Sequence, residues 1–273
     1  MFKLLFFGDI VGAIGRQAVV KILPKLREEF APDFVVANVE NLAHGRGITA
    51  KTLLELDAAG IDAYTSGNHV FENPVGLSCF DDARWKDRIV RPANMDPKLP
   101  GHGSIEINLP LTKGELRGSV RLAIFNILGQ LFVKENPSSP FLAFDRLFSE
   151  ASDADVVLVD FHAEATSEKE AFGHFADGRA TAVFGTHTHV PTADEKILPG
   201  GTAYTTDVGR NGEFDSVVGF EKNSALKVFL DSNAKSYEIS TTGTAEINAV
   251  LLTVDLDTKK AVALDRIRRF VDV

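Results

Sequence analysis

The sequence has a single cysteine, Cys79, so no disulfide can form within the chain. So little cysteine is typical of a reducing compartment, and we expect a cytoplasmic protein. The sequence also has no apolar run near the roughly 18 residues that a membrane-spanning helix needs. The apolar stretch at residues 2–7 is too short for the core of a signal peptide and lacks a small-residue cleavage site. We therefore predict a protein without a membrane partner.

Basic residues are in the minority, with 29 against 38 acidic residues and a net charge of −9, and they form no basic run. A general nucleic-acid binder needs a basic surface that releases counterions from the phosphates. We therefore predict no general nucleic-acid binding. An acidic chain can still bind a phosphate group locally where metal ions supply the positive charge.

Apolar runs alternate with helical spacings along the first 66 residues, and Thr52 with Glu55 has the spacing of a capping box. The expected strands are residues 2–7, 33–38 and 62–66, and the expected helices are residues 17–30 and 49–59. This order implies right-handed crossovers and a parallel sheet with helices on its faces.

The whole chain, residues 1–273, is expected to form one domain. Five prolines fall within residues 72–118, which we interpret as a small cap-like insertion with extended pieces at 89–91 and 104–109. Later strands are expected at 120–128, 155–161, 180–185, 203–207, 246–255 and 261–271, and helices at 141–149 and 168–175. The strands after Gly200-Gly201 are expected to form a second, partly antiparallel sheet, with a hairpin turn at Asp257-Thr258. The predicted fold class is α/β, a sandwich of two central mixed sheets flanked by helices.

Polar side chains follow five of the predicted strands. They are Asp9, Glu40 with Asn41, Asn68 with His69, His162, and His187 with His189. Ligands of open α/β sheets bind beyond the carboxyl ends of the strands, so these residues can converge on one site. Carboxylate, amide and imidazole groups suit manganese, iron or zinc. The absence of thiolate disfavours a structural zinc site.

Two metal ions about 3.5–4 Å apart can share a bridging carboxylate. Glu40 lies in the middle of the set and is the natural bridge. His187 and His189 would point to the same side of an extended segment, so they could serve two adjacent metals.

Most of these groups also have a structural interpretation when taken alone. Asp9 could cap the following helix, Glu40-Asn41 could form a solvated turn, and His162 could be an ordinary hydrogen-bonded histidine. Only His187-Thr188-His189, directly after a buried strand, favours metal binding unaided. Because four of the seven histidines follow apolar strands, the joint pattern favours a metal site.

These motifs resemble the calcineurin-like metallophosphoesterase superfamily. The matching stretches are Gly-Asp9, Glu40-Asn41, Gly-Asn68-His69, the lone His162 and His187-Thr-His189. Where the superfamily commonly has a histidine, a bridging aspartate and an acidic residue, this chain has Val11, Glu40 and Val70. These departures are similar to the YmdB-like branch of bacterial phosphodiesterases. Further stretches match that branch: 8–12, 45–49, 91–94, 185–194 and 206–209.

The resemblance implies a metallophosphoesterase-like fold, a homo-oligomer and a role in bacterial regulation. It also implies two metal ions, iron or manganese, with zinc or magnesium as further options, and hydrolysis of 2′,3′- and 3′,5′-cyclic nucleotides. By the match, Asp9, Glu40, Asn41 and His189 hold one metal, and Glu40, Asn68, His162 and His187 hold the other. A metal-bound hydroxide would attack phosphorus, and His69 would be the general acid.

Three alternatives stay open from the sequence. A phosphomonoesterase, such as a nucleotidase or a protein phosphatase, could use the same centre. A metal-bound regulatory scaffold with little turnover is a second alternative, although every expected ligand and His69 are present. A third interpretation, in which the histidines bind one structural zinc, is disfavoured by the number of oxygen ligands. Separately, Arg46 in Gly-Arg-Gly could touch phosphate, but a tight turn with a solvated arginine is the preferred interpretation. We expect His44, His102 and His174 to have ordinary structural or surface roles.

Overall fold

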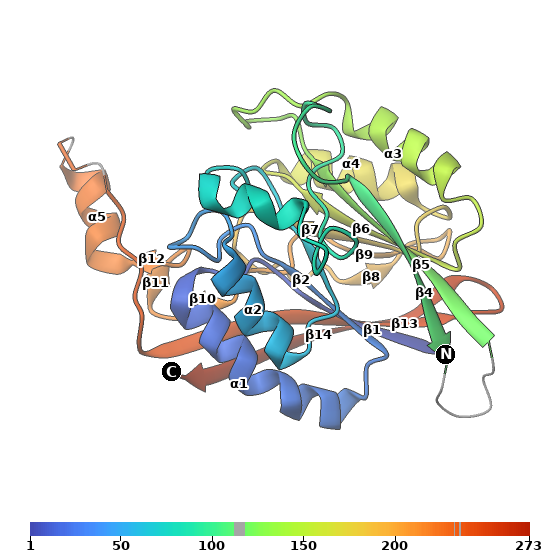
Figure 1. The fold of residues 1–273 in the computed structure, drawn as a ribbon, viewed down its shortest axis with the longest axis horizontal. Helices are drawn as coiled ribbons and strands as arrows, with labels where there is room; N and C mark the ends of the chain where they lie inside the picture. Colours follow the sequence, from blue (N-terminus) through green and yellow to red (C-terminus); the bar gives the residue numbers. More distant parts are fainter. Residues whose placement is uncertain (112–117, 232, 235) are drawn as a thin grey trace.

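The structure is a computed structural model that describes residues 1–273 with the exception of 112–117, 232 and 235. Two six-stranded sheets pack face to face, and helices cover the outer face of each sheet (Figure 1). The strand order is β10-β13-β1-β2-β3 in the first sheet, with β14 paired to β13, and β4-β5-β6-β7-β9-β8 in the second. Both sheets contain parallel and antiparallel pairs, which confirms the predicted fold class.

The first sheet is built from both ends of the chain. Its strands are β1 (Phe2–Phe7), β2 (Phe34–Asn38), β3 (Ala63–Thr65), β10 (Gly212–Glu213), β13 (Thr244–Asp255) and β14 (Lys260–Asp272). The helices α1 (Gly12–Phe30) and α2 (Ala50–Ala59) cover its outer face. The short 3₁₀ helix η1 (Pro74–Phe80) packs beside them, with Cys79 and the nearby Trp85 buried in the same cluster.

The second sheet comes from the middle of the chain. Its strands are β4 (Ser104–Leu111), β5 (Gly118–Leu128), β6 (Val156–His162), β7 (Ala182–Thr186), β8 (Lys196–Ile197) and β9 (Ala203–Thr205). The helices α3 (Pro140–Glu150) and α4 (Thr166–Ala176) cover it. The short strands β11 (Ser216–Val217) and β12 (Phe220–Glu221) and the helix α5 (Lys222–Leu230) lie outside both sheets.

Burial on both faces explains why the strand sequences are continuous apolar runs. In β1, Leu4 and Phe6 pack between the two sheets, whereas Leu5 and Phe7 pack against the helices. Successive strand side chains point to opposite faces, so a strand covered on both faces must be apolar at every position. The residues of β2 and β6 are also all buried, and these strands are apolar except towards their carboxyl ends, at Asn38, Asp160 and His162.

The prediction that the C-terminal strands form a second sheet is wrong. Strands β13 and β14 were expected in a second sheet, but β13 pairs antiparallel with β1, from Phe2 opposite Val254 to Phe7 opposite Ala249. The expected hairpin between them is confirmed, because β14 pairs antiparallel with β13. The strand β4, assigned to the expected insertion, is instead an edge strand that pairs with β5. A cap-like role for residues 72–118 stays a prediction.

Two local expectations also change. The capping box of α2 is formed by Thr49 and Thr52, whose hydroxyls each accept from the other's backbone N–H, at 3.2 and 3.0 Å. Glu55, expected in that role, pairs with Arg16 at 2.7 Å because it faces α1. The helix α1 begins at Gly12 and not at residue 17, and α5 had no counterpart in the prediction.

Among the described residues, no helix is both long and apolar enough to cross a membrane.

Candidate metal centre

The carboxyl ends of strands from both sheets meet at one edge of the sandwich. Asp9, Glu40 and Asn68 follow β1, β2 and β3 of the first sheet. His162 ends β6 and His187 follows β7 of the second sheet. All eight sequence-predicted site residues lie in this region, which the parallel arrangement of the strands explains.

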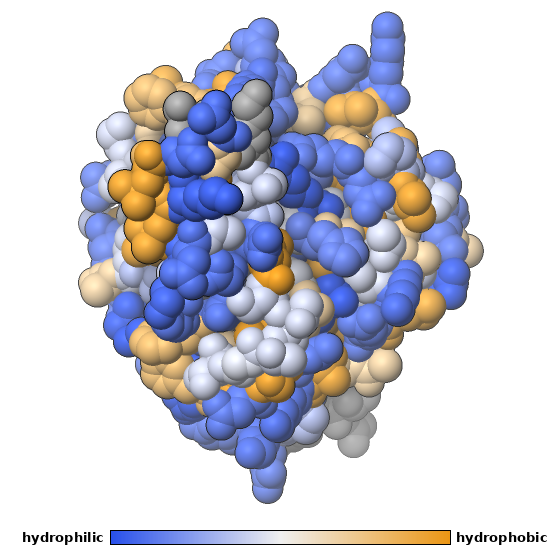
Figure 2. Space-filling model, turned by 90° about the vertical axis from the view of Figure 1, so that its left-hand side faces the viewer, coloured by the Kyte–Doolittle hydropathy of each residue, from blue (hydrophilic) through white to orange (hydrophobic). Residues whose placement is uncertain are grey.

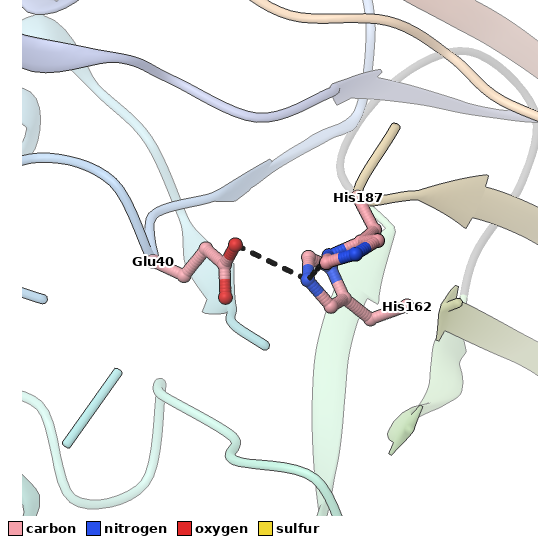
Figure 3. Close-up of side chains that lie close together, drawn as sticks. All are labelled: Glu40, His162 and His187. Atoms are coloured by element: carbon pink, nitrogen blue, oxygen red, sulfur yellow. Dashed lines mark hydrogen bonds and ion pairs between the residues drawn. The ribbon is translucent and has the colours of Figure 1, made fainter. Parts of the chain in front are cut away.

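The Nε2 atom of His162 is the meeting point of three other predicted ligands. It lies 3.1 Å from Glu40 Oε1, 3.0 Å from His187 Nδ1 and 3.2 Å from Asn68 Oδ1. Figure 3 shows Glu40 from the first sheet facing the two imidazoles from the second. The ligand atoms of Glu40, His162 and His187 all lie within 4.8 Å of one another, which is a suitable spacing for a shared ion.

A second group of ligand atoms shares Glu40 with the first. Asp9, Glu40 and His189 also offer atoms within 4.8 Å of one another. Beside them, Asp9 Oδ1 and Asn41 Oδ1 are buried and make no hydrogen bond. A buried oxygen without a partner is costly unless an ion or water satisfies it. The donor set and these two oxygens fit a pair of metal ions that share Glu40.

In the metal-free site, burial and the neighbouring charges shift the pKa values of the ligands in opposite directions. Burial raises the pKa of Asp9 against the opposing charges of His189 and His162. Burial would also raise the pKa of Glu40, but His162 outweighs it and lowers that pKa well below its usual range. Burial acts to lower the pKa of His162, yet Glu40 raises it to about 9. Burial, followed by the charge on His162, lowers the pKa of His187 to about 3.

Buried partners behind the ligands fix the orientation of His162. Thr186 Oγ1 donates to Asp160 Oδ1 at 2.6 Å, so it must accept its 2.9 Å bond from His162 Nδ1–H. The Nε2 lone pair of neutral His162 then faces the other ligands, as a metal ligand requires. Asp160 is itself held by Asn38 and Thr65. Burial raises the pKa of this carboxyl to about 6.

The segment that carries the last two histidines is not extended, contrary to expectation. His187 and His189 have φ values of 95° and 66°, in the left-handed region. Such backbone costs energy and persists where the surroundings hold it. Asp207 does so here, because its carboxylate accepts from both the N–H and the hydroxyl of Thr188, at 3.1 and 2.7 Å. His189 Nδ1 lies 2.7 Å from Val218 O, an arrangement that leaves its Nε2 free.

His69 is half-buried beside the ligand set. Its backbone N–H donates to Glu40 Oε2 at 3.0 Å, and its Nδ1 lies 2.6 Å from Glu72 Oε1. Glu72 also accepts a 3.1 Å bond from Arg46. Arg46 is therefore paired and not simply solvated, although more than half of its side chain is exposed. The Glu72 contact orients the His69 ring with Nε2 as the atom left for a ligand.

Sequence reasoning missed five residues that support the site: Asp160, Thr186, Asp207, Glu72 and Glu164. Glu164 Oε2 lies 3.1 Å from His187 Nε2. A signal existed for two of them. Asp160 precedes His162 by two residues on a strand and so shares its face, and Glu72 follows His69 by three residues within one turn.

A cavity of about 400 Å³ opens over the centre. One side is polar and includes Glu40, Asn41, His69, Glu164, His187 and His189, together with Arg46. The other side is mostly apolar and consists of Val217, Val218, Phe220, Phe229 and Tyr237. His44, His102 and His174 are not among its described lining residues. The cavity therefore offers one site with two unlike walls.

Comparison with known proteins gives consistent matches over nearly the whole chain. Residues 5–267 match the family described as YmdB-like protein. A Bacillus subtilis protein named 2′,3′-cyclic-nucleotide 2′-phosphodiesterase is 41% identical over 266 residues, 97% of this chain and 96% of the relative. A crystal structure of a hypothetical protein from Thermus thermophilus has a TM-score of 0.87 and 36% identity, covering 98% of this chain and 99% of the other. A Mycoplasma pneumoniae structure described as a novel phosphatase has a TM-score of 0.88 and 36% identity, covering 99% and 94%.

Proposed function

The chain belongs to the YmdB-like protein family, and we propose that it is a metal-dependent phosphodiesterase that hydrolyses cyclic nucleotides. The 2′,3′-cyclic and 3′,5′-cyclic AMP types are the proposed substrates. The proposal is supported by the cyclic-nucleotide activity in the name of the 41% identical relative. The two ligand groups that share Glu40 support the metal dependence of the proposed reaction.

The observation that carries the proposal is the position of Glu40 between the two groups. Asp9, Asn41 and His189 would hold one ion with Glu40, and Asn68, His162 and His187 would hold the other. Iron or manganese suits this set of oxygen and imidazole donors. Two such ions would supply the charge that polarises the phosphoryl oxygens and acidifies a water molecule.

The chain's own residues supply the proton and the geometry. When water adds to phosphorus, one ester P–O bond breaks and its oxygen leaves as an alkoxide that needs a proton. His69 is proposed to donate this proton from Nε2, while Glu72 holds the ring through Nδ1 at 2.6 Å. General acid catalysis of this kind contributes roughly 10²–10⁴-fold. The product is a phosphomonoester.

A phosphomonoesterase on the same centre is the second candidate, because the solved Mycoplasma pneumoniae relative is described as a phosphatase. The ligand set alone does not distinguish the two reactions. They differ in whether the phosphate that is attacked carries one ester bond or two.

The test measures turnover of 2′,3′-cyclic AMP, bis-p-nitrophenyl phosphate and p-nitrophenyl phosphate by protein purified with Mn²⁺, together with metal content. We expect turnover of both diesters and about two metals per chain. His69→Ala should keep its metals and lose roughly 10²–10⁴-fold in kcat. His174→Ala, an exposed histidine on α4, is the matched control and should behave like the parent.

Turnover of the monoester alone would favour the phosphomonoesterase. Bound metals without turnover of any of the three compounds would favour a regulatory scaffold. Unchanged activity in His69→Ala would exclude His69 as the general acid.

A further inference from the structure

The apolar wall of the cavity belongs to an arm that projects from the body. Residues 214–241, described apart from 232 and 235, contain β11, β12 and α5, and α5 projects away from both sheets (Figure 1). Glu221 caps α5 by accepting from the N–H groups of Asn223 and Ser224, at 2.9 and 2.7 Å. The backbone N–H of Glu221 also donates to Glu238 O at 2.8 Å, which joins the outgoing and returning parts of the arm.

Two contacts fix the arm against the metal centre. Ile239 on the returning part fits so closely against Gly12 and Gly45 that a Cβ added at either glycine would overlap its side chain. On the outgoing part, the carbonyl of Val218 lies 2.7 Å from His189 Nδ1. The position of the arm is therefore tied to a predicted metal ligand and to the loop between β2 and α2, which contains Gly45.

Three aromatic rings from the arm line the cavity: Phe220, Phe229 and Tyr237, which we call the aromatic wall. The rings of Phe220 and Tyr237 lie 4.7 Å apart at an interplanar angle of 31°. Phe229 is 76% exposed and Tyr237 is 40% exposed. Figure 2 looks onto the face that carries the arm, where apolar residues gather beside a hydrophilic surface. Large exposed rings beside a polar site indicate a surface that a ligand covers.

We propose that the aromatic wall binds the base of a nucleotide by stacking, while the phosphate lies at the metal centre. This inference rests on the proposed function and deepens it. A nucleotide has one charged end and one flat aromatic end, and the cavity has one polar and one aromatic side. Its volume of about 400 Å³ falls in the usual range for small-ligand sites. Stacking accepts any base because every base has a π-face, so the wall selects nucleotides over esters without a base.

The test measures equilibrium binding to the metal-loaded full-length protein by calorimetry. The ligands are adenosine 3′-monophosphate and ribose 3-phosphate, which differ only in the base. We expect the parent to bind the nucleotide more tightly. Phe229→Ala should weaken nucleotide binding about 5- to 100-fold and leave ribose 3-phosphate binding unchanged.

Two further variants make the result specific. Leu230→Ala changes the adjacent residue of α5, which is 84% exposed and is not among the residues that line the cavity, so both affinities should stay the same. Phe229→Tyr keeps a stacking ring and should retain nucleotide binding. Because Phe229 is exposed, none of these changes removes core packing.

Equal affinity of the parent for the two ligands would overturn the base site. An equal loss for both ligands in Phe229→Ala, or no loss for either, would overturn it as well. Because this experiment measures binding and not turnover, it can exclude the base site without excluding the phosphodiesterase activity, and the reverse also holds. A protein that binds adenosine 3′-monophosphate through Phe229 but hydrolyses no cyclic nucleotide would keep the base site and exclude the phosphodiesterase.

Discussion

His162 shows how single residues set the chemistry of the centre. In the metal-free protein its ring faces Glu40 and Asp9, and its pKa is raised from 6.5 to about 9. The proton stabilises the folded protein fully below about pH 6.5, and this stabilisation is lost as the pH rises through 9. A metal ion needs the Nε2 lone pair, so binding must displace that proton.

Metal binding should therefore release protons at neutral pH and tighten as the pH rises towards 9. We expect about one proton from His162 at pH 7. Titration of Mn²⁺ into the metal-free protein in two buffers of different ionisation enthalpy measures the number released. Affinity that is independent of pH between 6.5 and 9 would contradict the assignment of His162 as a ligand.

The hydroxyl of Thr186 fixes which nitrogen of His162 carries the proton. Thr186→Val keeps the shape but removes the acceptor of the 2.9 Å bond from Nδ1. Loss of such a supporting contact typically costs 10–100-fold in metal affinity. Competition with a chelator of known affinity measures this loss. Thr202→Val is the control, because its buried hydroxyl donates to Ala180 O away from the centre and should leave metal affinity unchanged.

At the scale of secondary-structure elements, the turns that follow the strands set the distances between the ligands. Gly67 lies between β3 and Asn68, and a Cβ there would overlap both Glu40 Oε2 and His162 Nε2. Both of those side chains are buried, so neither can move aside readily. The glycine is therefore needed for close approach of the backbone to the ligands.

Gly67→Ala should lose most of the bound metal and most of the turnover while its helix content stays the same. Elemental analysis and far-ultraviolet circular dichroism measure the two properties. His69→Ala, in the same turn, is the control for general damage to this loop because it should keep its metals. Full metal content in Gly67→Ala would show that the ligands lie elsewhere.

At the scale of the whole molecule, the candidate centre joins the two sheets. Asp9 and Glu40 come from the first sheet, and His162 and His187 from the second. Without metal, burial raises the pKa of the Asp9 carboxyl, and the negative charge of the nearby Glu40 adds to that rise. Bound ions would therefore stabilise the contact between the two sheets in addition to their role in the reaction.

Removal of metal should lower Tm. A ligand present at a thousandfold excess over its Kd stabilises the folded state by about 4 kcal/mol, which corresponds to roughly 10 °C for a chain of this size. Scanning calorimetry with Mn²⁺ and then with EDTA measures the difference. The His162→Ala variant should show a much smaller shift, and an equal shift in both proteins would mean that the metal binds elsewhere.

The sequence by itself determined the local features. Continuous apolar runs identified the strands around the site, and polar residues just after them identified Asp9, Glu40, Asn68, His162 and His187 as candidates. Both signals are local, because a strand buried on two faces must be apolar along its length. The end of a parallel strand is also where a ligand site forms, whichever strands lie beside it.

Only the tertiary structure decided which strands are neighbours and what surrounds the ligands. The pairing of β13 with β1 depends on packing between residues about 250 positions apart, which no local pattern encodes. The left-handed backbone at His187 and His189 depends on Asp207, which follows strand β9 and lies 19 residues beyond Thr188. The aromatic wall likewise reaches the cavity because Ile239 fits against Gly12 and Gly45, a contact between segments far apart in the chain.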